Sequence, residues 1–245
     1  MGMPIGIEVR DALEPGGVEW AFDWFRSVDA TFSAHRPDSQ IGQIRRGTLA
    51  VAEAEPAVRE VLARCEALRL ATGGFFDAFA TGRLDPSGLV KGWAVDRAAE
   101  LLERAGARRF WVGAGGDLVL RGGEPWRVGI RHPCRRDRLA CVVELSDGAV
   151  ATSGAYERGP HIVDPHAGRP PRGVLSVTVL GPDLATADAY ATAAFAMGVG
   201  GPAWTAALEG YEAMTILEEG RVLSTPGFLR RCPGGSVAAS LAAGA

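Results

Sequence analysis

The stretch TADAYATAAFAMG, residues 186–198, is a helix-forming segment with two polar side chains at a telling distance. Asp188 and Thr192 are four residues apart, and side chains at this spacing lie on one face of a helix. A carboxylate and a hydroxyl so placed offer two hard oxygen ligands. They suit a magnesium ion that keeps waters or takes phosphate oxygens as its other ligands. Such a pair is more often a helix cap or a solvated arrangement, so the interpretation depends on the rest of the chain.

The composition is that of a globular protein with room for a large core. The chain has 245 residues, of which 47% are hydrophobic and 22% are charged, and its net charge is −3. This balance, without a block of one sign, disfavours a nucleic-acid or anionic-membrane surface. The sequence contains no run of about 18 apolar residues, so it predicts no membrane span. The first residues contain no recognisable signal peptide, so the expected location is cytoplasmic.

The cysteines and histidines do not form a metal-binding pattern. The four cysteines show no Cys-x-x-Cys spacing, and the four histidines form no His-x-x-x-His pair. A disulfide framework, a structural zinc site and a zinc enzyme of the usual kind are therefore disfavoured.

Hydrophobic periodicity and turn residues predict an α+β fold, with antiparallel-rich sheets and packed helices in one mixed domain over residues 1–233. Residues 234–245 are small and low in complexity and are expected to form a flexible tail. Helices are predicted at 18–32, 56–70, 87–105, 185–197 and 203–208, with SGLVKG as the entry loop of the third. Strands are predicted at 3–9, at 109–119 with a break at GAGG, and at 126–131, 139–145, 149–154 and 174–180, followed by a hairpin over 211–225.

Two segments are candidate phosphate sites. In GAGGD, residues 113–117, successive glycines let the backbone approach a phosphate closely. The segment matches neither the dinucleotide fingerprint nor the Walker motif, and a bulge or tight turn is an equal alternative. Lys91 is predicted at a loop-to-helix junction, where free amides attract anions. The alternative for Lys91 is a surface side chain that covers Trp93.

Residues 152–171, TSGAYERGPHIVDPHAGRPP, read as a long ordered loop, and such loops inside compact domains are usually functional. His161 precedes Ile162 and Val163, which predicts that it is held on a short strand. As a lone histidine it has a plain alternative, that of a satisfied core or surface imidazole. The polar cluster in residues 29–42 likewise has the alternative of a capped turn before a helix.

Together these segments resemble, in order and along nearly the whole chain, the ApbE family of FAD:protein FMN transferases. The motifs that carry the resemblance are MGMPIGIEV (1–9), FSAHRPDSQIGQI (32–44), TGGFFD (72–77), SGLVKGWAVDRAAELL (87–102), VGAGGDL (112–118), ATSGAYERGPHIVDPHAGRP (151–170) and SVTVLGPDLATADAYATAAFAMG (176–198).

The resemblance implies a T-fold-like architecture and a Mg²⁺-dependent reaction. FMN would pass from FAD to a Thr or Ser hydroxyl of an acceptor protein, with release of AMP. It implies Gly88, Asp188 and Thr192 as metal ligands, and His161, the candidate base, and Asp188 as the catalytic residues. It places the flavin site on Met1, Ser39, Phe76, Asp77, Lys91, Gly115, Gly116, Ser153 and Ile162.

The chain departs from the family pattern in four places. His35 stands where the family commonly has a tyrosine, which alters stacking at that position. Only 13 residues (78–90) separate Asp77 from Lys91, so part of the usual wall of the flavin site is expected to be missing or rebuilt. Ala167 replaces a threonine of the family. Met1 matches the methionine that opens the family's first motif, so the chain is expected to begin inside the first strand.

Two other functions fit the same residues. In the first, water replaces the acceptor hydroxyl, and the protein is an FAD pyrophosphatase that gives FMN and AMP. In the second, the protein binds FAD without turnover. The identity of the attacking oxygen does not follow from the sequence, because that oxygen comes from outside the chain.

Overall fold

The computed structural model describes residues 2–156 and 159–233, as a sheet with layers on both of its faces. The α-helices are α1 (Gly17–Phe32), α2 (Gln40–Arg45), α3 (Pro56–Ala71), α4 (Ser87–Arg104), α5 (Leu184–Ala196), α6 (Gly201–Thr205) and α7 (Pro226–Arg230), with short 3₁₀ turns η1 (Val51–Glu53) and η2 (Gly198–Gly200). The strands are β1 (Ile5–Val9), β2 (Phe110–Ala114), β3 (Asp117–Arg121), β4 (Trp126–Arg131), β5 (Leu139–Leu145), β6 (Gly148–Gly154), β7 (Val174–Gly181), β8 (Glu212–Leu217) and β9 (Val222–Ser224).

The main sheet has seven strands in the order β1-β2-β3-β6-β7-β8-β9, and all neighbouring pairs are antiparallel. Successive side chains of a strand point to opposite faces. In β7, Val177 and Val179 therefore belong to the core under the helices, whereas Leu180 belongs to the core on the other face. Both faces of this sheet are buried.

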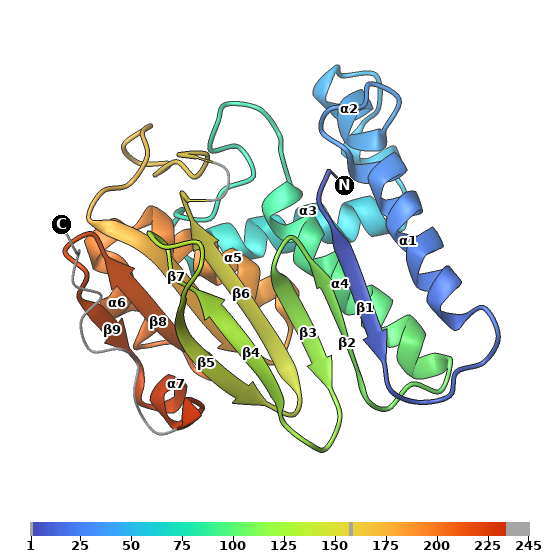
Figure 1. Ribbon diagram of the computed structural model, residues 1–245. Helices are drawn as coiled ribbons and strands as arrows, with labels where there is room; N and C mark the ends of the chain where they lie inside the picture. The colour runs from blue at the N-terminus through green and yellow to red at the C-terminus, as the bar shows by residue number, and fades with distance from the viewer. Residues whose placement is uncertain (1, 157–158, 234–245) are drawn as a thin grey trace.

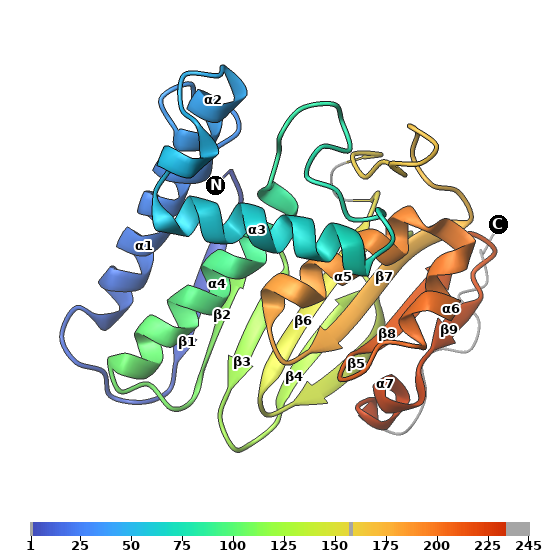
Figure 2. The ribbon, with the colours of Figure 1, turned by 180° about the vertical axis from the view of Figure 1, so that it is seen from behind.

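Helices α1, α4 and α5 cover one face of the sheet, and α3 packs on the outside of α4 (Figure 2). In α1 the buried side chains Ala21, Phe25, Val28 and Phe32 recur at helical spacing and face the core. Trp93 of α4 lies with its ring centroid 5.3 Å from that of Phe32, which fixes α4 beside α1.

The β4–β5 hairpin and α7 cover the opposite face of the sheet (Figure 1). Trp126, Ile130 and Val143 of the hairpin are buried against the outward side chains of the main sheet. Because both faces of the sheet are covered, the long loops lie at the end of the sheet rather than on a face. The segments 72–86 and 159–173 project side by side from this end, where His166 Nε2 lies 2.9 Å from the Gly73 carbonyl oxygen (Figures 1 and 2).

Helices α4 and α5 cross in close backbone contact at Gly92. A Cβ atom at this position would lie 2.7 Å from the Cα atom of Ala185 and 2.7 Å from the carbonyl oxygen of Leu184. Only glycine therefore allows the first turn of α5 to rest directly on α4.

The predicted α+β fold with one mixed domain is confirmed, as are the five helices and the strands, within a few residues at their ends. The glycine pair 73–74 and Gly106 follow α3 and α4 with positive φ, as their place after a helix predicts. Helices α2 and α7, of six and five residues, were not predicted, because so few residues show little period; α6, of five residues, was predicted with its bounds shifted toward the C-terminus. Met1 and the expected tail, residues 234–245, lie outside the described residues, so the domain boundary stays a prediction. The expected start inside the first strand is wrong, because residues 2–4 precede β1 and form no strand.

The Gly92→Ala variant tests the helix crossing. We expect a loss of about 1–3 kcal/mol in the free energy of unfolding, because the new methyl group meets backbone that cannot move aside. The loss should appear even though alanine favours a helix over glycine by about 1 kcal/mol. Urea denaturation measures it. Gly200→Ala is the matched control, since its Cβ would meet nothing within 4 Å. Equal stability of the Gly92→Ala and Gly200→Ala variants would contradict a close backbone contact of α4 and α5 at Gly92.

Candidate functional site

A cleft of about 260 Å³ opens at the end of the sheet where the two long loops project. Its walls come from the 72–86 loop, the start of α4, the β2–β3 turn, the end of β6, the 159–173 loop and α5. Ten of the predicted site residues line this cleft: Phe76, Asp77, Gly88, Lys91, Gly115, Ser153, His161, Ile162, Asp188 and Thr192.

The floor of the cleft holds an ammonium group between two carboxylates. Lys91 Nζ forms an ion pair with Asp117 Oδ2 and a second one, at 3.2 Å, with Asp188 Oδ1. Asp117 and Asp188 are 2% and 3% exposed, so both pairs are shielded from solvent. Burial lowers the pKa of Lys91, but the attraction of Asp188 and Asp117 outweighs it and raises the pKa above its ordinary value. Lys91 therefore stays charged.

The structure corrects the expected position of Lys91. Residues 87–92 belong to α4 itself rather than to an entry loop, so Lys91 lies in the second turn of the helix. The alternative of a surface lysine covering Trp93 is wrong, because the Trp93 ring packs against Trp24 and Phe32 of α1. The helix instead directs the ammonium group at the two carboxylates.

Asp117 was not assigned a role from the sequence. It closes the GAGGD segment as the first residue of β3, and its Oδ1 accepts a 2.8 Å hydrogen bond from the Thr152 amide on β6. Its partners are 26 and 35 residues away in the chain. The one sequence signal for a role of Asp117 was its position directly after a glycine turn that resembles a phosphate-binding segment.

The chemistry of the donor set fits magnesium. The Asp188 carboxylate, the Thr192 hydroxyl and the Gly88 residue line one cleft, and hard oxygen donors in this number leave room for waters or phosphate oxygens. Ser153 Oγ lies 3.2 Å from Thr192 Oγ1 and orients that hydroxyl. Within residues 2–156 and 159–233, no three His, Cys, Asp or Glu side chains gather as a metal-binding group. The predicted set contains only one such residue, so it would depend on ligand and water oxygens.

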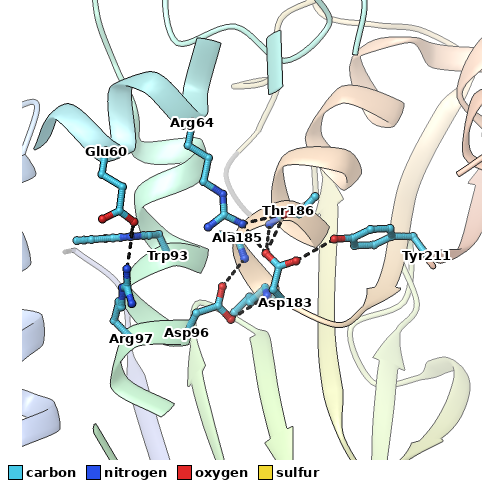
Figure 3. A network of polar contacts seen from close by, with 10 residues as sticks. Glu60, Arg64, Trp93, Asp96, Arg97, Asp183, Ala185, Thr186 and Tyr211 are labelled. Carbon is cyan, nitrogen blue, oxygen red and sulfur yellow. Dashed lines mark hydrogen bonds and ion pairs between the residues drawn. The ribbon is translucent and has the colours of Figure 1, made fainter. Parts of the chain in front are cut away.

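The first turn of α5 is held by carboxylates from two sides (Figure 3). Asp96 of α4 accepts the amides of Leu184 and Ala185, each at 2.9 Å. Asp183 caps the helix through the Thr186 amide, also at 2.9 Å. Anionic groups at a helix N-terminus satisfy its free amides and complement its dipole. These contacts fix the helix that carries Asp188 and Thr192.

Asp183 is in turn held by two more side chains. The Arg64 guanidinium donates to Asp183 Oδ1 at 2.6 Å, and the Tyr211 hydroxyl donates to Oδ2 at 2.8 Å (Figure 3). Although burial raises the pKa of Asp183, the hydrogen bonds from Thr186 and Tyr211 and the charge of Arg64 lower it below its usual range. Burial raises the pKa of Asp96 to about 6 despite its two backbone hydrogen bonds. The Asp183 charge raises it further, and Arg64 opposes this effect.

His161 is exposed at the rim of the cleft and does not lie on a strand, so the expectation of a short strand is wrong. Among the described residues of this loop, 159–173, strand-like pairing is limited to an isolated bridge between Asp164 and Arg169. His161 Nδ1 lies 2.9 Å from the Gly159 carbonyl oxygen. Because a carbonyl oxygen can only accept, Nδ1 carries the proton in the neutral ring, and Nε2 keeps its lone pair. Nε2 is therefore the atom that can take a proton.

The glycines of the GAGGD segment form a tight hairpin turn. Ala114 pairs with Asp117, and Gly115 and Gly116 between them have φ values of 61° and 97°. Two central residues with positive φ define a type I′ turn, which requires glycine or a similar residue. The Gly115 amide donates to the Pro4 carbonyl oxygen at 3.1 Å, so it is not available to a phosphate. Gly116 is exposed at the turn and does not line the cleft.

The remaining predicted residues differ in how they meet the cleft. Phe76 is buried, and its ring lies close to Gly88. A Cβ atom added to Gly88 would lie 3.3 Å from the Phe76 ring. Asp77 Oδ1 accepts from the Phe79 amide at 2.8 Å. Ser39 lies outside the cleft as the N-cap of α2, and its hydroxyl bonds the backbone of its own segment. Its place in the flavin site stays a prediction, as does that of Met1.

The fold is that of solved flavin transferases. The structure of the flavin transferase ApbE from Vibrio cholerae matches this chain with a TM-score of 0.83 and 23% identity, over 94% of this chain and 96% of that one. A model of the ApbE family matches residues 1–82 and 78–215. The chain therefore belongs to the ApbE family.

Curated relatives carry the name FAD:protein FMN transferase. The protein from Salmonella typhimurium is 33% identical over 156 residues, which cover 58% of this chain and 45% of that protein. The protein from Vibrio cholerae is 40% identical over 129 residues, which cover 47% of this chain and 39% of that protein. The matched part of this chain thus spans less than half the length of either relative.

In the part of the chain that the structure describes, no helix has both the length and the apolar character needed to cross a membrane.

The Asp96→Asn variant tests the anchoring of α5. A carboxyl group in an unfolded chain titrates near about 3.9, whereas burial raises the pKa of Asp96 to about 6. The native state then binds more protons than the unfolded state between these values. The contribution of Asp96 to stability therefore falls as the pH rises through this window.

We expect the asparagine variant to be less stable, since an amide oxygen cannot replace both acceptors, and to lose this part of the pH slope. Urea unfolding of both proteins at several pH values from about 4 to 7 measures the slope. If the free energy of unfolding of the two proteins changed with pH in the same way, the role of Asp96 in anchoring α5 would be contradicted.

Proposed function

We propose that this protein transfers FMN from FAD to a Thr or Ser hydroxyl of an acceptor protein, with release of AMP and with Mg²⁺ as cofactor. Membership of the ApbE family and the name of the curated relatives support this reaction. The observation that carries it is the cleft itself: Lys91, largely shielded from solvent, is paired with two carboxylates at the floor, and His161 lies at the rim. We place the reaction in the cytoplasm.

The proposed reaction requires little covalent chemistry from the protein itself. The acceptor oxygen attacks the phosphorus on the riboflavin side of the diphosphate, the bond from that phosphorus to the bridging oxygen breaks, and AMP leaves with the bridging oxygen. His161 Nε2 accepts the hydroxyl proton. Its Nδ1 hydrogen bond to the Gly159 carbonyl oxygen holds the ring in the tautomer that this step requires.

Charge at the floor of the cleft supports the same reaction. The Lys91 ammonium is a permanent positive charge near the place where the diphosphate oxygens would lie. A magnesium ion held by Asp188, Thr192 and the Gly88 carbonyl would add Lewis-acid stabilisation of those oxygens. Phe76, Asp77 and Ile162 line the walls and would orient the flavin nucleotide.

Hydrolysis of FAD is the second candidate, and the exposure of His161 favours it. Because the imidazole is open to solvent at the rim, water can reach the position proposed for the acceptor hydroxyl. The same residues would then release FMN and AMP.

An incubation with FAD and Mg²⁺, with and without candidate acceptor proteins, separates these functions. Intact-mass measurement detects the addition of FMN to an acceptor, and chromatography detects AMP. Acceptor modification with matching AMP supports transfer, and AMP with free FMN regardless of acceptor supports hydrolysis. Tight FAD binding without AMP under every condition would reject both.

The His161→Ala variant should reduce FMN transfer by about 10²–10⁴-fold, the usual contribution of a positioned base. FAD affinity should stay within about twofold, because the imidazole does not build the floor of the cleft. Single-turnover assays and fluorescence titration measure these two quantities. His166→Ala is the matched control on the same loop, since the His166 side chain packs against Gly73 and Phe75 of the cleft wall but does not itself line the cleft. Near-normal transfer by His161→Ala would refute the role.

A further inference from the structure

Asp117 is linked indirectly to both side-chain ligands of the candidate cation site, Asp188 and Thr192. Its Oδ2 pairs with Lys91, whose Nζ also pairs with Asp188. Its Oδ1 accepts the Thr152 amide, and the next residue, Ser153, hydrogen-bonds the Thr192 hydroxyl. One buried carboxylate is thus connected to Asp188 through Lys91 and to Thr192 through the β6 backbone.

The charge balance of this group depends on Asp117. Two carboxylates and one ammonium leave one net negative charge, and all three side chains are largely shielded from water. Electrostatic interactions are strong in such surroundings. Without the Asp117 charge, Lys91 and Asp188 would neutralise each other, and a divalent cation would have to displace the ammonium group to reach the carboxylate.

We propose that Asp117 is a positioning residue of the cation site, which engages Lys91 so that Asp188 stays available to a divalent cation. It also holds the β6 backbone that places Ser153 against Thr192. The link to FMN transfer rests on the proposed function, whereas the effect on cation binding is independent of it.

The test measures Mn²⁺ binding, by electron paramagnetic resonance, to the full chain without FAD or acceptor. Asp117→Asn keeps the shape of the side chain and an oxygen for the Thr152 amide, but it removes the charge. We expect its dissociation constant for Mn²⁺ to rise at least tenfold. The double variant Lys91→Met with Asp117→Asn should bind Mn²⁺ within about threefold of the unaltered protein, since no ammonium then competes for Asp188.

Asp85→Asn is the matched control. Asp85 also lines the cleft, but its Oδ1 accepts the Ser87 amide at 3.1 Å, a bond that asparagine can keep. Its variant should change the Mn²⁺ dissociation constant less than threefold. An equal loss in Asp85→Asn and Asp117→Asn would show a general effect of charge and overturn the proposal.

A role of Asp117 in folding alone would leave the double variant as weak as Asp117→Asn, and that result would also overturn the proposal. If Asp117→Asn does not fold, Lys91→Met alone decides: removal of the competing ammonium should tighten Mn²⁺ binding, and unchanged or weaker binding counts against the proposal. Failure of the proposed function would appear separately, as no FMN addition to any acceptor whatever the Mn²⁺ affinity.

Discussion

The site depends on the contact between α4 and the first turn of α5. Gly92 lets the two backbones meet, and Asp96, one helical turn further along α4, accepts two amides of α5. Because α4 carries Lys91 and α5 carries Asp188 and Thr192, this contact sets the distance between the ammonium group and its carboxylate partner. The Arg64, Asp183 and Tyr211 contacts reinforce it from the outer side.

The fold was largely predictable because its elements are long and periodic. The core face of α1, the alternation in the strands and the glycines after α3 and α4 are local signals. The secondary-structure predictions that failed also concern short local segments. Helices α2 and α7 are shorter than two turns, and the apolar pair after His161 imitated a strand that the structure does not form. The SGLVKG segment resembled a loop because of its glycines, whereas one of these glycines serves a helix crossing.

The candidate site was predictable where its residues share an element or a motif. Asp188 and Thr192 lie four residues apart on α5, so helix geometry alone places them on one face. Asp117 could not be assigned in this way, because its partners Lys91 and Thr152 come from other elements of the fold. The glycine turn before Asp117 drew attention as a phosphate site, but its conformation is that of a hairpin turn whose Gly115 amide bonds Pro4. Long-range ion pairs leave little trace in a single sequence.

The β4–β5 hairpin has a consequence for how this protein can vary. With helices on one face of the main sheet and the hairpin on the other, each face has its own core. The candidate site then lies at the end of the sheet, and the rim at that end consists largely of connections between core elements. The connection that precedes α4, residues 78–86, can therefore differ in length at small cost in loop entropy, since that cost grows only slowly with length. A family built in this way can exchange the outer wall of its binding site while the scaffold beneath keeps its shape.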